Sequence, residues 1–442
     1  MPLFSNNSLT IKNYFSLLLA LLPISFIAGN LIININILVI IISALIVFKS
    51  KVFQITYYWF DKLLFFFFFI ILYTGVYNDY FFYLNELSWK GYFSTIFKSL
   101  FFLKYLFFYI VLRYLVKTQH INLKFFFISC GLSTIFVSID IFYQFIFGKD
   151  IFGFEAIEYS SRRKLSGPFG DELIAGGFIQ RFSVFSFFIL PLFFQSKSKY
   201  LSRYFIPILF IIFLTGIILS GNRMPMVLFV FTVFLILVFN KEIRKFFIPF
   251  VLIFSFLFTL ILNIDSEIKT NFKSFYKQIS KMTVIIINKD FKNDSSPQYL
   301  KEFGTFYDTW LINKYIGGGI KNFRYYCHVR PNVNKDAKFV CNMHPHNYYL
   351  EILTETGILG FVVIIFSFSL LIYQSLIKKY FLKSNFHYDN KIIPFIFLFF
   401  VEIFPLKSTG SFFTTGNATY LFLIMGILVG LLPKYYYIEN KN

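Results

Sequence analysis

The sequence predicts an all-α polytopic membrane protein with about twelve transmembrane helices. The first reason is composition, since 57% of the 442 residues are hydrophobic and only 14% are charged, a balance typical of chains that lie in lipid. The second reason is length, because the apolar residues form runs of about 20, which a helix needs to cross the hydrocarbon core. These runs are centred near residues 21, 40, 69, 105, 135, 183, 210, 232, 254, 362, 398 and 425.

The loops between these runs predict the orientation of the chain. Lys and Arg concentrate in every second loop, and loops of this kind remain in the cytoplasm. The basic residues are Lys49, Lys51 and Lys62; Arg113, Lys117 and Lys124; Lys197, Lys199 and Arg203; Lys241, Arg244 and Lys245; and Lys378, Lys379 and Lys383. We therefore expect cytoplasmic termini, a bacterial inner-membrane location with the other loops in the periplasm, and no cleavable signal peptide.

The Lys and Arg residues behind the net charge of +20 lie mostly in these loops, where they face anionic membrane lipid. In a water-soluble protein such a charge would suggest a nucleic-acid partner. Here the cations determine topology, so we expect membrane lipid and no nucleic acid among the partners.

The predicted topology divides the chain into five segments. Residues 1–148 hold the first five spans, 149–171 form a periplasmic loop, 172–264 hold four more spans, 265–348 form a large periplasmic loop, and 349–434 hold the last three spans. The large loop lacks the Phe and Ile bias of the spans, which predicts a small water-facing subdomain. Within it we expect an amphipathic helix that is capped at Ser296 and ends at Gly317, Gly318 and Gly319.

Two of the three cysteines lie in the large loop. Cys327 and Cys341 are fourteen positions apart, and an oxidising periplasm allows a disulfide between them. A metal site with neighbouring histidines is the alternative, but the spacing lacks a Cys-x-x-Cys pair, so we expect no metal. Cys130 lies inside an apolar run and is expected to be a small core residue.

Several arginines lie in or near apolar runs or in predicted periplasmic loops, where a positive charge is unusual. Arg223 follows a tight Ser-Gly-Asn turn between two apolar runs, where it is either a snorkelling anchor or a ligand for an anion such as phosphate. Arg181 lies inside an apolar run and is either functional or paired with Asp140. Arg163 belongs to a basic trio in the periplasmic loop over 149–171. Arg324 follows three glycines, a weak signal that more often marks only the end of a helix.

The end of the large loop contains a candidate general base. Asn347 is a suitable N-cap for the next span, and the positive end of that helix dipole favours a neutral imidazole at His346, which could accept a proton from a hydroxyl group. A histidine that is merely solvated at a helix start is the alternative. Glu351 and Glu355 lie one turn apart, where they could orient a hydroxylated acceptor or form structural salt bridges with Arg223 or Arg324.

Four segments together resemble the O-antigen ligase and O-antigen polymerase superfamily of bacterial envelope glycosyltransferases. They read "RRKLSGPFGDELIAGGFIQR", "LSGNRMPMVLF", "GGGIKNFRYYC" with "CNMHPHNYYLEILTETGILGF", and "FPLKSTGSFFTTGNATYLFLIMGILVG", and they span residues 162–430, with the ligase-related core over 200–370. The glycines depart from the family's Gly-Ile-Gly-Pro form, and Glu351 stands where a Gln is common.

The resemblance implies a glycosyltransferase C type fold that moves a glycan from undecaprenyl pyrophosphate to an acceptor hydroxyl, with inversion and without a metal or cofactor. His346, Arg223 and Arg324 match the family's functional residues, and they would be catalytic. The expected substrate-binding residues are Arg181, Arg163, Asn347 and Glu355.

Within this superfamily, ligation to lipid A core is our first expectation. Polymerisation of repeat units and O-linked transfer of an oligosaccharide to protein are the alternatives, and the sequence does not choose between them. A polysaccharide transporter or flippase is the rival from another class, but a transporter should show repeat symmetry, whereas here only the second half has a large loop. A membrane scaffold without activity is the weakest reading.

Overall fold

The computed structural model describes residues 3–80, 94–158, 163–194, 198–288, 298–330, 341, 346–382, 388–407 and 410–433. Its regular secondary structure is helical apart from an isolated bridge between Lys149 and Glu155 and one small antiparallel hairpin, β1 (Ile157–Glu158) with β2 (Arg163–Lys164), in which Glu158 pairs with Arg163. The prediction of an all-α fold is therefore confirmed for the described residues, and the hairpin is a local feature of the loop over 149–171.

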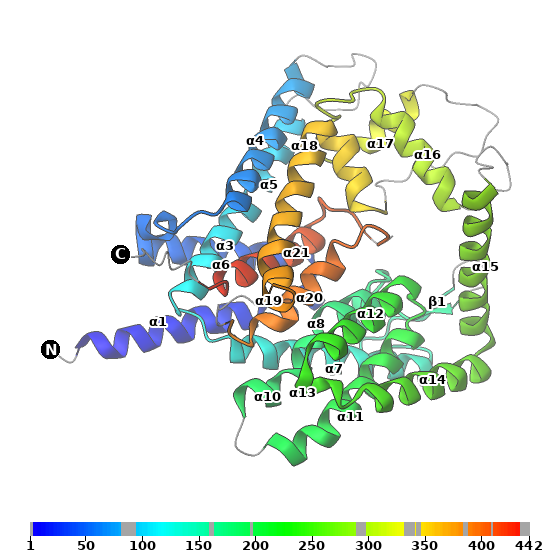
Figure 1. The fold of residues 1–442 in the computed structure, drawn as a ribbon. Helices are drawn as coiled ribbons and strands as arrows, with labels where there is room; N and C mark the ends of the chain where they lie inside the picture. The colour runs from blue at the N-terminus through cyan, green and yellow to red at the C-terminus, as the bar shows by residue number, and fades with distance from the viewer. Residues whose placement is uncertain are drawn as a thin grey trace.

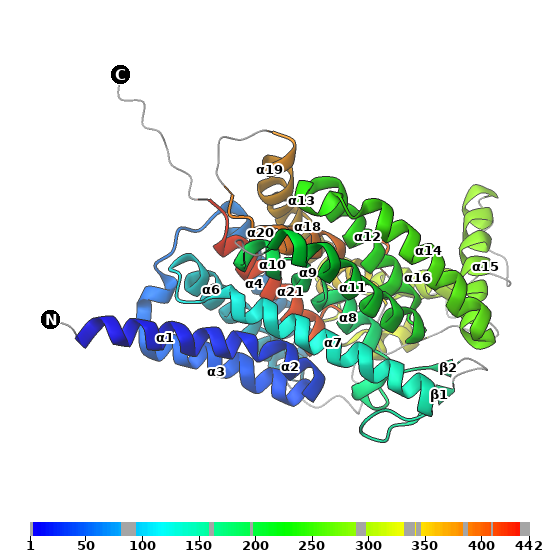
Figure 2. The ribbon, with the colours of Figure 1, turned by 90° about the horizontal axis from the view of Figure 1, so that it is seen from below.

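The first part of the chain forms seven α-helices. They are α1 (Leu3–Ala20), α2 (Leu22–Ala28), α3 (Asn30–Phe48), α4 (Trp59–Tyr80), α5 (Ser94–Phe102), α6 (Lys104–Lys117) and α7 (Leu123–Phe147). Gly29 has φ of 101°, a conformation that a residue with a side chain rarely adopts, and it lets the chain reverse between α2 and α3. Figure 2 shows α1, α3 and α7 side by side, and α1 packs against both partners.

Among its described residues, the middle part contains eight α-helices and the short 3-10 turn η2 (Gly167–Phe169). The helices are α8 (Ala175–Phe182), α9 (Val184–Phe187), α10 (Ile189–Phe193), α11 (Ser198–Leu219), α12 (Arg223–Phe239), α13 (Lys241–Arg244), α14 (Phe247–Ile264) and α15 (Ser266–Asn288). Breaks at Ser183 and Phe188 divide the sixth apolar run into α8, α9 and α10.

The last part contains six helices: α16 (Gln298–Trp310), α17 (Phe323–Tyr326), α18 (Tyr348–Ile372), α19 (Lys378–Tyr380), α20 (Ile392–Glu402) and α21 (Thr415–Gly430). The 3-10 turn η4 (Cys327–Val329) follows α17, and the π-helical turn η5 (Tyr373–Ile377) joins α18 to α19. In Figure 1 α18 lies beside α4, and α16 and α17 lie near the start of α18.

Eight helical stretches in the described part of the chain are long and apolar enough to cross a membrane. Shorter apolar helices cover 203–219, 223–239, 392–402 and 415–430. Each predicted centre falls within one of these stretches, so the apolar pattern located the helices well, while the count of twelve spans stays a prediction. Many outward side chains are apolar, such as Leu31 and Phe101, each 71% exposed, which suits a surface that faces lipid.

The last helix, α21, lies at the centre of the bundle. All its residues from Ala418 to Gly430 are buried, and it packs along α6. A Cβ atom on Gly426 would lie 3.2 Å from the Tyr109 carbonyl oxygen, and one on Gly430 would lie 3.1 Å from the Arg113 carbonyl oxygen. These two glycines therefore allow the two helices to approach closely.

The position of Arg113 differs from the predicted topology. We expected it in a cytoplasmic loop, but it lies in α6 with no exposed surface. Its guanidinium contacts the Asp61 carboxylate at 2.6 Å, and Tyr109 also donates a hydrogen bond to that carboxylate. Hydropathy alone could not distinguish a loop arginine from one paired inside the bundle, because the partner lies on another helix.

The large loop over 265–348 contains more helix than the sequence predicted. The expected amphipathic helix is α16, but it ends at Trp310, well before the glycines, and its predicted cap Ser296 lies outside the described residues. The longer helix α15 was not anticipated. It lies at the edge of the molecule, whereas α16 packs on α18 (Figure 1).

Candidate functional site

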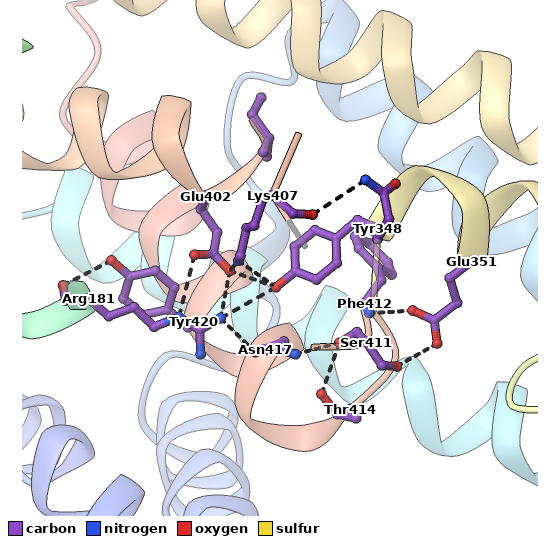
Figure 3. A network of polar contacts seen from close by, with 12 residues as sticks. Arg181, Tyr348, Glu351, Glu402, Lys407, Ser411, Phe412, Thr414, Asn417 and Tyr420 are labelled. Carbon is purple, nitrogen blue, oxygen red and sulfur yellow. Dashed lines mark hydrogen bonds and ion pairs between the residues drawn. The ribbon is translucent and has the colours of Figure 1, made fainter. Parts of the chain in front are cut away.

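A buried polar network joins the ends of several helices. Arg181 of α8 donates hydrogen bonds to Glu402 of α20 at 2.8 Å and to the Asn417 side chain of α21 at 2.6 Å. Its guanidinium also lies 4.9 Å from the centre of the Tyr420 ring. Figure 3 shows these side chains turned toward one another. Arg181 therefore has a carboxylate partner, and that partner is Glu402, not the expected Asp140, which accepts from the Ile151 backbone N–H.

The Glu402 carboxylate is shared by a second cation. Lys407, in the loop after α20, contacts it at 2.5 Å, and the Tyr348 hydroxyl donates to it at 2.6 Å. Burial lowers the pKa of Lys407, Glu402 raises it and Arg181 lowers it, and the net pKa is about 7. Two cations thus converge on one buried carboxylate, a costly arrangement unless every member stays hydrogen-bonded.

Asn347, the residue that follows His346, holds the start of α18. Its side-chain oxygen accepts from the backbone N–H groups of Tyr349 and Leu350 at 3.0 and 3.2 Å, which makes it the N-cap of α18 as predicted. Its amide nitrogen donates to the Pro405 carbonyl oxygen at 2.7 Å. Asn347 thereby ties the start of α18 to the loop after α20, and His346, which is half-buried, lies directly before this cap.

Glu351 is part of the same framework. Its two carboxylate oxygens accept from the Ser411 hydroxyl and from the Phe412 backbone N–H, each at 2.5 Å. The sequence left open whether Glu351 forms a salt bridge with Arg223 or Arg324. The structure uses this carboxylate to hold the loop before α21 instead (Figure 3).

Glu355, one turn further along α18, is 1% exposed. The backbone N–H groups of Lys321 and Phe323 face its carboxylate, but neither oxygen completes a hydrogen bond with a described residue. A buried carboxylate in this state is unusual because it loses its hydration without full replacement. Glu355 thus lacks the two short hydrogen bonds that hold Glu351.

The three glycines pack directly on the backbone of α18. Gly318 N–H donates to the Thr354 carbonyl at 2.9 Å and Gly319 N–H to the Glu355 carbonyl at 2.8 Å. Gly357 has φ of +66° and interrupts the regular geometry of α18. A Cβ atom there would lie 2.2 Å from the Tyr315 carbonyl oxygen, so the contact requires glycine.

This contact positions Arg324. Arg324 lies in α17, five residues after the last of the three glycines, and its Nε atom is buried with no hydrogen-bond partner among the described residues. The next turn is held by a disulfide between Cys327 and Cys341, the pair that the sequence analysis favoured. Phe306 of α16 and Phe323 pack beside Cys327, so α16, α17 and Cys341 form one small cluster.

Arg223 begins α12 after the predicted tight turn, where Gly221 has φ of +69°. Its Nη1 atom donates to the Asn271 carbonyl at 3.4 Å and to the Ser274 hydroxyl at 3.2 Å. Both acceptors belong to α15. The Asn271 side chain is fully buried, and its amide nitrogen and oxygen have no partner among the described residues.

Helix α8 links the Arg223 turn to the start of α18. At one end, a Cβ atom on Gly176 would lie 2.7 Å from both Asn222 Cβ and Ser220 Oγ, so α8 touches the turn that carries Arg223. Five residues later, Arg181 reaches the Tyr348 hydroxyl at 3.5 Å, and five residues of α-helix rise about 7.5 Å. The Arg223 turn and the start of α18 therefore lie on one side of the molecule.

Arg163 is the remaining predicted site residue. Its backbone lies in β2, but its side chain is outside the described part of the structure. The β hairpin belongs to the same end of the fold, because Gln144 of α7 accepts from Gly167 N–H at 3.0 Å and the Phe169 ring packs on Phe178 of α8.

Sequence reasoning missed several members of the network: Tyr348, Glu402, Lys407, Ser411, Asn417 and Tyr420. One signal was present, since Glu402 is an acidic residue within an otherwise apolar run. An intramembrane arginine and an intramembrane glutamate in one chain are natural partners. The other members are uncharged or lie in a loop, and nothing in their local pattern marks them.

Part of the chain is similar to a known protein family. The model of the family described as O-antigen ligase matches residues 208–365, which include the Arg223 turn, α15, the three glycines, His346 and the first part of α18. No curated protein matches the chain. With its apolar helices, the chain is a multi-pass membrane protein that carries a domain of the O-antigen ligase superfamily, a superfamily of membrane glycosyltransferases.

Proposed function

We propose that the protein moves a glycan from undecaprenyl pyrophosphate to an acceptor hydroxyl on the periplasmic face of the inner membrane, with lipid A core as the first candidate acceptor. The observation that carries this proposal is the position of α8, which brings the Arg223 turn and the segment after His346 to one side of the molecule. A lipid-linked pyrophosphate presents its charge at that kind of membrane boundary.

In the proposed reaction, His346 accepts the proton of the acceptor hydroxyl as its oxygen bonds to the anomeric carbon. The bond between that carbon and the pyrophosphate oxygen breaks, and undecaprenyl pyrophosphate leaves with the electron pair. Attack from the opposite side inverts the anomeric configuration. Arg223 and Arg324 neutralise the leaving group, since a guanidinium can grip phosphate oxygens with two parallel hydrogen bonds.

The contacts refine the expected substrate-binding roles. Arg181 and Asn347 are occupied by Glu402 and Pro405, so we assign them to positioning the start of α18. Glu355 has a buried carboxylate without a completed hydrogen bond, so we propose that it accepts hydrogen bonds from sugar hydroxyls. Arg163 stays a candidate contact for the pyrophosphate.

We further propose that the reaction needs no metal ion and no cofactor, because arginines supply the positive charge at the leaving group. Purified protein in vesicles with a lipid-linked glycan and a core acceptor should form product equally well with and without a chelator. Loss of product in the chelator would overturn the metal-independent mechanism. Movement of the lipid-linked glycan across the bilayer without transfer would instead establish a flippase.

A deletion strain identifies the member of the superfamily. If the protein is a ligase, the strain should accumulate lipid-linked polymer and lack polymer on lipid A core. A single repeat unit on the core would indicate an O-antigen polymerase, and the loss of glycan from a protein would indicate a protein O-oligosaccharyltransferase.

A further inference from the structure

Helix α15 leaves the bundle at the end of an apolar helix. Only 11% of α14 is buried inside the protein, which suits a helix that faces lipid. The chain turns at Asp265, whose carboxylate accepts from the backbone N–H groups of Glu267 and Ile268 at 2.8 and 2.9 Å and so caps α15. In Figures 1 and 2 α15 runs crosswise to α14. If α14 spans the membrane, α15 lies along its surface.

One face of α15 carries a row of cations. Lys269, Lys273, Lys277 and Lys281 occur at every fourth position, and all four are exposed. Side chains four residues apart on a helix are neighbours, and like charges at this spacing destabilise the helix. Glu267 is the only acidic residue of α15, so the helix itself carries one carboxylate and these four lysines. Such a row suits an anionic surface.

A second face of α15 is apolar. Its first half packs on α14, where the Phe272 ring lies 5.2 Å from the Phe258 ring. Its second half has no such cover, since Ile279 is 46% exposed and Ile287 is 72% exposed. Exposed isoleucines next to a lysine row are typical of a helix that lies in the interface between headgroups and acyl chains.

The third face of α15 contacts the protein through Arg223. The Asn271 carbonyl and the Ser274 hydroxyl accept from its guanidinium, and the Phe275 ring lies 5.5 Å from it. All four lysines remain exposed although this face is occupied. Through these contacts α15 meets the start of α12.

We propose that α15 is an interfacial helix whose lysine row binds the phosphate groups of anionic phospholipids in the adjacent leaflet, while Ile279 and Ile287 enter the acyl boundary. The partner is the lipid surface, and the proposal does not depend on the transfer reaction. It has a consequence for that reaction, because anchoring α15 to the leaflet would hold the Arg223 guanidinium at the depth of a lipid-borne phosphate.

The test places a fluorescent probe on α15 in the full chain. Cys130 is buried and the other two cysteines are bonded to each other, so an Ile279→Cys variant can be labelled at one position with an environment-sensitive dye. The protein is reconstituted in vesicles of equimolar phosphatidylglycerol and phosphatidylcholine, or of phosphatidylcholine alone, with bromine on the acyl chains. We expect strong bromine quenching in the anionic vesicles.

Charge variants test whether the lysine row is responsible for the quenching in anionic vesicles. Replacing the four lysines with Gln should reduce quenching toward the level in phosphatidylcholine, because each lysine near an anionic surface contributes roughly five-fold to binding. Replacing them with Arg should preserve quenching. Lys49→Gln with Lys51→Gln, two exposed lysines after α3, is the matched control and should have no effect.

Three results would overturn the proposal. The dye on residue 279 could remain unquenched in anionic vesicles, the four-Gln variant could be quenched as strongly as the parent, or inorganic phosphate could replace phosphatidylglycerol in producing the quenched state. The last result would identify a site for free phosphate. None of these readouts requires transferase activity, so they are independent of the proposed function.

Discussion

The guanidinium of Arg181 lies 2.8 Å from the carboxylate of Glu402, although the two residues are 221 positions apart in the chain. Lys407 shares the same carboxylate at 2.5 Å. This relationship makes Glu402 the residue on which the buried network depends, because each of the two cations would otherwise be buried without a counter-charge.

We therefore predict that Glu402→Gln destabilises the protein by about 3–5 kcal/mol, the usual cost of removing one partner of a buried ion pair. Thermal unfolding in detergent measures the effect. The control is Glu155→Gln, which removes an exposed pair with Lys149 and should change stability by less than about 1 kcal/mol. Equal, small changes in the two variants would show that the network contributes little.

Lys407 predicts a specific pH dependence. Its pKa in the folded protein is about 7, below the ordinary value of 10.5, so between these values the unfolded chain binds more protons at this site. Stability should then rise with pH across this interval and lose that gain as the pH falls toward 7. Lys407→Met should remove this slope, whereas Lys149→Met, at an exposed lysine, should preserve it. Parallel melting curves for Lys407→Met and the parent would contradict the prediction.

The contact between the glycines and α18 predicts a clear difference between two glycine substitutions. Gly357→Ala forces a Cβ atom to within 2.2 Å of the Tyr315 carbonyl at a positive φ, so we expect lower thermal stability and, through Arg324, lower transfer activity. Gly304→Ala is the control, since a Cβ atom on this helical glycine meets nothing within 4 Å. It should be neutral or stabilising. A neutral Gly357→Ala would show that the contact is not required.

The proposed chemistry predicts different outcomes for two histidines. His346→Ala should reduce the transfer rate by about 10² or more, as expected for the loss of a general base, while the melting temperature changes little. His328→Ala, an exposed histidine in the turn after α17, should retain full activity. Product formation from a lipid-linked glycan in vesicles is the measurement. Normal turnover in His346→Ala would eliminate its proposed role.

Arg223→Ala should cause a comparable loss, because the guanidinium is proposed to stabilise the charge that develops on the leaving pyrophosphate. Arg223→Lys keeps the charge but not the two parallel donors, so we expect only partial recovery. The measurement is again product formation, with the melting temperature as the check on folding. Full activity in Arg223→Ala would exclude this residue from the site.

Most of the fold could be predicted from hydropathy because each apolar run must satisfy its backbone within its own helix. The pattern does not show which helices are neighbours. For this reason Arg113 was assigned to a loop although it pairs with Asp61, and Arg181 was matched with Asp140, 41 positions before it, when its partner is Glu402. Pairing across a bundle depends on tertiary packing, which a single sequence does not encode locally.

The candidate site was predictable to the extent that its residues disturb an apolar pattern. Arg223, His346 and Asn347 stand at the boundaries of helices, where the sequence signals are strong, and the cap at Asn347 was expected. Tyr348 and Ser411 could not be predicted in this way, because nothing in their local sequence marks them. Their role arises from tertiary contacts, of Tyr348 with Glu402 and of Ser411 with Glu351. Helix α15 was not predicted because its lysines interrupt the apolar pattern, so that the segment resembles a loop.

The Arg181 network also bears on how the protein is made. Glu402 and Asn417 are synthesised 221 and 236 residues after Arg181, so Arg181 lacks these partners until the end of the chain has been made. A chain truncated at residue 390 would keep the whole region matched by the family model, 208–365, and still lack these partners. The region defined by sequence similarity therefore contains neither Arg181 nor its two partners, Glu402 and Asn417.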